Sequence, residues 1–76
     1  MSNLRMSVLI QAAGKRIWSI CDEIKRVEGI KAVEVVVGTF DAIAYAELDT
    51  KDELRLFLDS IHKIEGIIRT ETCIAY

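Results

Sequence analysis

The segment Gly38-Thr39-Phe40-Asp41 carries more chemistry than a connection between two strands requires. It offers a hydroxyl, an aromatic ring and a carboxylate beside a glycine, which lets the backbone approach a bound molecule closely. Exposed amides beside Asp41 can hold the carboxylate of an amino acid while Asp41 holds its ammonium group. An aspartate near a turn often caps its own backbone instead, and a phenylalanine near a strand end often packs on the core. Both interpretations stay open on these residues.

A second polar pattern lies near the end of the chain, where Thr70 and Thr72 alternate. In a strand, both hydroxyls point to one side and can donate to a carboxylate. Threonines are also β-branched residues that simply fill strands. The spacing does not discriminate between the two roles.

Residues suited to catalysis or metal binding are few. His62 is the single histidine, and we expect it on the surface, in the last turn of a helix. Cys21 and Cys73 lack further ligands at metal spacing, so we expect reduced, mostly buried thiols. No nucleophile motif or phosphate-binding loop occurs. The sequence therefore predicts no enzyme, no metal site and no cofactor.

Length and charge restrict the class of protein further. The 76 residues suffice for a single domain over 1–76, and the net charge of −2 disfavours direct nucleic-acid binding. No apolar run approaches the roughly 18 residues of a membrane span. The N-terminus does not read as a signal peptide, which predicts the cytoplasm. A core this small predicts oligomerisation as extra stabilisation.

Hydrophobic periodicity and glycines divide the chain into six elements. The first helix is expected between Gly14 and Gly29, and the second between the capping box at Thr50–Glu53 and Gly66. The four expected strands cover 6–12, 32–37, 42–48 and 67–76.

The two halves of the chain repeat each other at an offset of 37, because 24–30 matches 61–67. This order, βαββαβ, predicts an α+β, ferredoxin-like fold. Right-handed crossovers then give a four-stranded antiparallel sheet of order 4-1-3-2 with both helices on one face.

The other face of that sheet is expected to be too apolar to remain in water. The strand residues that face the helices include Val33, Val35 and Val37. The opposite face carries the residues of a predicted dimer interface: Leu9, Gln11, Val36, Ile43, Tyr45 and Glu47. The alternative is that Trp18 or a chain terminus covers this face.

Gly38–Asp41, an apolar strand, a helix rich in acidic residues and then Glu65–Thr72 follow one another in an order that resembles a known family. The sequence is similar to the effector-binding (RAM) domain of the Lrp/AsnC regulators over nearly its whole length. That resemblance implies a homodimer formed through the sheets and a ring of four or five dimers, an octamer or decamer.

The resemblance also implies an amino-acid effector bound between dimers. Gly38, Thr39, Phe40 and Asp41 inherit this role by position, followed by Thr70 and Thr72. Full-length family members carry a helix-turn-helix before this domain. This chain begins a few residues before its first expected strand, so we expect a stand-alone form whose partners include a full-length regulator.

Three functional hypotheses follow. The first is a non-enzymatic module that senses a small molecule, an amino acid, through assembly. The second is a small dimeric ferredoxin-like enzyme, a cofactor-free oxygenase or isomerase, which would need a polar group inside its core. The third is a scaffold module in which the turn is only a turn.

Overall fold

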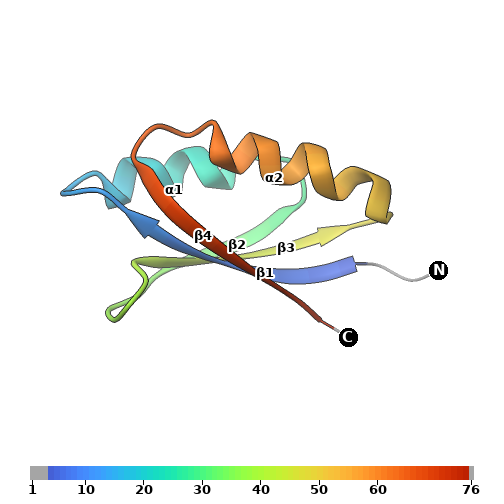
Figure 1. Cartoon of the computed structure of the whole chain (residues 1–76), viewed down its shortest axis with the longest axis horizontal. Helices are drawn as coiled ribbons and strands as arrows, with labels where there is room; N and C mark the ends of the chain where they lie inside the picture. Colours follow the sequence, from blue (N-terminus) through green and yellow to red (C-terminus); the bar gives the residue numbers. More distant parts are fainter. Residues whose placement is uncertain (1–3, 76) are drawn as a thin grey trace.

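The computed structural model describes residues 4–75, which form a four-stranded antiparallel sheet with two helices packed on one face (Figure 1). The elements are β1 Leu4–Ala12, α1 Ile17–Lys25, β2 Ile30–Val35, β3 Ala42–Leu48, the 3₁₀ turn η1 Lys51–Glu53, α2 Leu54–His62 and β4 Ile67–Ile74. The strand order β2-β3-β1-β4 is the predicted order 4-1-3-2 counted from the other edge. The ferredoxin-like α+β fold is confirmed.

The internal repeat is visible as two matching junctions between a helix and the strand that follows it. The Val27 amide donates to the Ile24 carbonyl at 3.0 Å, and the Ile64 amide donates to the Ile61 carbonyl at 3.1 Å. Each junction ends in a glycine with positive φ, 102° at Gly29 and 103° at Gly66. Only glycine adopts this backbone conformation without strain.

Both glycines also lie against the core. A Cβ on Gly66 would stand 2.8 Å from Ile20 Cδ1, and a Cβ on Gly29 would stand 2.8 Å from Leu48 Cδ2. The same local packing therefore positions both strands that follow a helix, β2 and β4.

The second strand was predicted over 32–37 and lies over 30–35. Gly29 leads directly into it, as Gly66 leads into β4. The last cross-strand hydrogen bond at its far end runs from the Val36 amide to the Asp41 carbonyl at 2.9 Å, and the chain turns beyond it. Val37 is fully exposed, so the prediction that it faces the helices is wrong.

The observed bounds differ from the predicted ones by smaller amounts at the ends of other elements. The first strand begins at Leu4, and the last ends at Ile74, while Tyr76 lies outside the described residues. The second helix opens through η1, where Glu53 Oε1 accepts the Asp49 amide at 2.9 Å. That contact comes from the expected capping glutamate.

The core lies between the sheet and the helices. Its central members have no exposed surface: Val8, Ile10, Ile20, Ile24, Ala42, Ala44 and Ile61. No polar or charged side chain is buried within residues 4–75. Cys21 belongs to this core, but Cys73 is exposed, so the prediction that both thiols are buried is wrong for Cys73. In the described part of the chain, no helix is long and apolar enough to cross a membrane.

The sheet face away from the helices carries no covering element in the described range (Figure 1). The register places Leu9 opposite Ile43 and Ile43 opposite Glu34, so these side chains share this bare face. Trp18 lies on α1, on the helix side, and is 69% exposed. It therefore does not cover the bare face.

Candidate functional site

The turn 38–41 lies at the end of the sheet where β1 ends and β4 begins (left side of Figure 1). The Asp41 amide donates to the Ile10 carbonyl at 2.8 Å, and Asp41 Oδ2 accepts the Ala12 amide at 2.8 Å. These two bonds anchor the turn to β1. Asp41 therefore has a structural role, but it binds the backbone of β1 rather than capping its own turn. Its Oδ1 atom accepts no hydrogen bond within residues 4–75 and can accept one from a ligand or a second chain.

The backbone amides of the three residues before Asp41 differ from it in their hydrogen bonding. Gly38, Thr39 and Phe40 lie in a bend, and their amides donate no hydrogen bond within residues 4–75. The space beside Gly38 is open, since a Cβ built there would meet no atom within 4 Å. A ligand or a second chain can therefore reach these donors directly.

Phe40 contacts a residue that sequence reasoning did not choose for the site. The guanidinium carbon of Arg69 stands 5.1 Å from the centroid of the Phe40 ring. Arg69 is near the start of β4, opposite Gln11 of β1, and its side chain is exposed. Only the β1–β4 register brings it beside the turn. No local motif could have identified this pair.

The two threonines share one side of β4, as predicted. Thr70 lies opposite Ile10 and Thr72 opposite Val8, so both lie on the helix side of the sheet. Thr70 Oγ1 is 2.9 Å from Nε2 of the exposed His62, which joins β4 to the end of α2. Thr72 is farther along β4 from the turn. The geometry thus associates Thr70 with the turn end more closely than Thr72.

The predicted interface residues lie on or next to the bare face. Tyr45 is 38% exposed, and its hydroxyl donates to Glu34 Oε1 at 3.0 Å. This hydrogen bond, aided by the negative charge of Glu34, raises the pKa of Tyr45 above its ordinary value. Val36 is half-buried but lies just beyond β2 rather than inside a strand.

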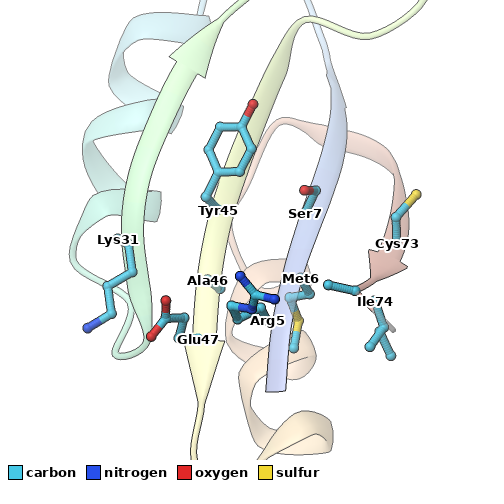
Figure 2. Close-up of a pocket in the computed structure, with 10 residues that line it drawn as sticks. Arg5, Met6, Ser7, Lys31, Tyr45, Ala46, Glu47, Cys73 and Ile74 are labelled. Atoms are coloured by element: carbon cyan, nitrogen blue, oxygen red, sulfur yellow. The ribbon is translucent and has the colours of Figure 1, made fainter. Parts of the chain in front are cut away.

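A shallow hollow of about 410 Å³ opens at the other end of the sheet (Figure 2). Its walls include Arg5, Lys31, Tyr45, Glu47 and Cys73. Figure 2 shows the Arg5 and Lys31 side chains on either side of Glu47. Because Tyr45 and Glu47 also belong to the predicted interface, we regard this hollow as part of the pairing surface. The unused donors are at the turn end instead.

Comparison with known proteins gives a consistent result. No protein-family profile matches the chain. An uncharacterized HTH-type transcriptional regulator of Pyrococcus furiosus is 30% identical over 66 residues, which are 87% of this chain and 45% of that protein. The chain thus spans less than half the length of this curated relative.

Solved structures extend the comparison to the whole fold. A protein from Thermus thermophilus, TTHA0845, superposes with a TM-score of 0.88 at 30% identity, over 96% of this chain and 92% of that one. E. coli AsnC superposes with a TM-score of 0.86 at 18% identity, over 95% of this chain and 50% of that one. The regulator NMB0573 of Neisseria meningitidis, solved as a complex with L-Met, gives 0.84 at 10% identity, over 96% and 49%. At such low identities the last two show a shared fold alone.

Proposed function

Since the chain belongs to the Lrp/AsnC family, as a counterpart of the effector-binding (RAM) domain of these regulators, we propose that it is a non-enzymatic module that senses an amino acid and oligomerises. The observation that carries this proposal is the turn at 38–41. Within residues 4–75, its carboxylate keeps one oxygen free of hydrogen bonds, and three neighbouring amides donate none. An α-amino acid presents the complementary pair of an ammonium and a carboxylate group.

In the proposed binding mode, the ligand ammonium group binds the second carboxylate oxygen of Asp41. The amides of Gly38 and Thr39 are available to the ligand's other polar groups, and Phe40 supplies apolar contact. Thr70 borders the same end of the sheet, with Thr72 beyond it. The complex of NMB0573 with L-Met supports an amino-acid ligand for a protein of this fold.

The bare face is the proposed pairing surface. Leu9, Ile43 and Tyr45 form its apolar centre, with Gln11 and Glu47 beside them and Val36 at the hairpin loop. An exposed apolar surface with a polar rim is typical of a protein interface. Two copies meet sheet to sheet in this proposal. Such dimers then form a ring, an octamer or decamer, in the cytoplasm, alone or mixed with a full-length regulator.

The composition of the core supports a non-enzymatic role. A reaction between the sheet and the helices would need an acid or a base there. Within residues 4–75, the side chains buried in that layer are all hydrophobic. Related proteins of this fold are transcriptional regulators, which agrees with a sensing rather than a catalytic module.

Thermal unfolding with each of the twenty amino acids tests the sensing role. At least one should raise the melting temperature, because a ligand that binds only the folded oligomer stabilises it by mass action. Asp41→Asn is the informative variant, since its side-chain oxygen can still accept the Ala12 amide while its negative charge is lost. We expect the fold to remain and affinity to fall about tenfold to hundredfold, the effect of one charged hydrogen bond.

Asp59→Asn is the matched control, because Asp59 is an exposed aspartate on α2. This variant should bind as the unaltered chain does. No response to any amino acid would contradict the proposal. Equal binding by Asp41→Asn and the unaltered chain would remove Asp41 from the site.

A further inference from the structure

Arg69 is a charged residue at the turn end whose guanidinium has no acceptor within residues 4–75. Its guanidinium lies over the Phe40 ring, 5.1 Å from the centroid. Stacking of this kind uses the flat face of the guanidinium and leaves its N–H donors directed outward. In the described part of the chain, those donors make no hydrogen bond or ion pair. The group is therefore oriented but unpaired.

The turn already uses some of its own polar groups. The Asp41 amide is bonded to Ile10 and the Asp41 Oδ2 atom to Ala12. A ligand carboxylate at this end of the sheet therefore has to bind other donors. Such donors include the amides of the bend and the guanidinium of Arg69, which lies over the ring of Phe40.

We propose that Arg69 binds the α-carboxylate of the amino-acid effector, with Phe40 holding the guanidinium flat for a two-pronged contact. This inference rests on the proposed sensing function and adds the residue that selects for an acid. A planar guanidinium matches a carboxylate with two parallel hydrogen bonds, which an ammonium group does not reproduce. The site then has a positive group for the carboxylate and the negative Asp41 for the ammonium.

The competing role for the stacked pair is mechanical. Arg69 would then only tie the loop that carries Phe40 to β4. Loss of that tie would weaken binding of every ligand at the turn by a similar factor. Loss of a carboxylate-binding group acts differently, because it weakens binding of acids and leaves binding of their neutral amides nearly unchanged.

The test uses isothermal titration of the full chain with the amino acid that binds most tightly among the twenty, and with its carboxamide. We expect the unaltered chain to prefer the acid about tenfold to hundredfold, the effect of one charge-assisted contact. Arg69→Gln should bind acid and amide within about threefold of each other. Arg69→Lys keeps the positive charge but lacks the planar guanidinium. Its preference for the acid should lie between those of Arg69→Gln and the unaltered chain.

Arg55→Gln is the matched control, since Arg55 is an exposed arginine on α2. It should keep the full preference for the acid. Circular dichroism should show that all three variants are folded, because both arginine side chains are exposed.

Two outcomes distinguish a failure of this inference from a failure of the proposed sensing function. If Arg69→Gln keeps the full preference, or loses acid and amide binding equally, Arg69 does not bind the carboxylate, although amino-acid sensing stands. If the unaltered chain binds none of the twenty amino acids, the sensing function fails and this inference fails with it.

Discussion

The two faces of the sheet are built from alternate residues of the same strands, yet they end in opposite environments. On β3, Ala42 and Ala44 are fully buried under the helices, whereas Ile43 is half-buried and Tyr45 is 38% exposed. The helix face of β3 uses the small residues Ala42, Ala44 and Ala46, all of which are buried. The bare face keeps larger apolar side chains for which the described chain has no cover.

If copies pair as proposed, one chain divides its hydrophobic residues between folding and association. The helix face supplies the core of the monomer. The bare face adds apolar area that a single copy cannot bury, and burial of such area is the main driving force of association. The comparison therefore predicts that equal changes on the two faces have unequal consequences.

The largest difference between the two faces should appear when the same substitution, to lysine, is made at the neighbouring residues Ala44 and Ile43. Ala44→Lys puts a long cation into a fully buried position, at a cost of several kcal/mol even after relaxation. That cost approaches the whole stability of a small domain, about 5 to 15 kcal/mol. We expect this variant to be unfolded by circular dichroism.

Ile43→Lys should remain folded, because its position is open to water and opposite Glu34. Its cost to the monomer should be about 1 kcal/mol, the span of strand preferences. Pairing should weaken about hundredfold, because the added charge would have to lose its water in the interface. Ile43→Ala provides a neutral control. Ile43→Lys chains that pair as tightly as the original would contradict the interface.

The thiols offer a second, smaller contrast between a core position and the bare face. Burial raises the pKa of the Cys21 thiol, so it forms less thiolate at neutral pH. Cys73 is exposed on β4, opposite Ser7. In the Ile43→Lys background, where the bare face stays open to solvent, we expect a thiol reagent to modify Cys73 first and Cys21 only after denaturant is added.

Single-cysteine variants make the measurement specific. Cys73→Ser leaves only Cys21, which should react slowly, and Cys21→Ala leaves only Cys73. Equal rates for the two thiols in the folded protein would show that the helix face is not closed.

The smallest effect concerns the pair formed by Tyr45 and Glu34 on the bare face. The bond to the carboxylate raises the pKa of Tyr45, so its stabilising contribution is complete below the ordinary tyrosine value of about 10. It is lost as the pH rises through the higher value of the folded state. Sheet pairing would add burial, which acts in the same direction.

Ultraviolet titration of a Tyr76→Phe variant reports on Tyr45 alone. We expect its midpoint to lie above the ordinary value, and Glu34→Gln to lower it toward that value. An unchanged midpoint in the glutamine variant would mean that the bond does not form in solution.

The fold could be predicted because its signals are local. The repeat around Gly29 and Gly66 placed both helix ends, and the capping glutamate Glu53 marked the start of the second helix. The end of β2 was misplaced, because the valines at 35–37 all favour a strand, whereas the chain turns directly after the last cross-strand bond, from Val36 to Asp41.

The site was only partly accessible to the same reasoning. The turn was identified from its residue types, but the only structural role considered for Asp41 was a cap on its own backbone, and its bond to the Ala12 amide of β1 was missed. Arg69 was missed because its contact with Phe40 depends on the pairing of β4 with β1. Sequence spacing carries no information about which strands become neighbours at that end.

The central claim is that a single copy leaves one sheet face uncovered and that copies meet through it. Sedimentation equilibrium of the unaltered chain from 1 to 100 μM tests this most directly. We expect a mass of a dimer or a multiple of it throughout, and in Ile43→Lys a mass that falls toward the 8.6 kDa of the monomer at the lowest concentrations. A folded monomer at every concentration of the unaltered chain would contradict it.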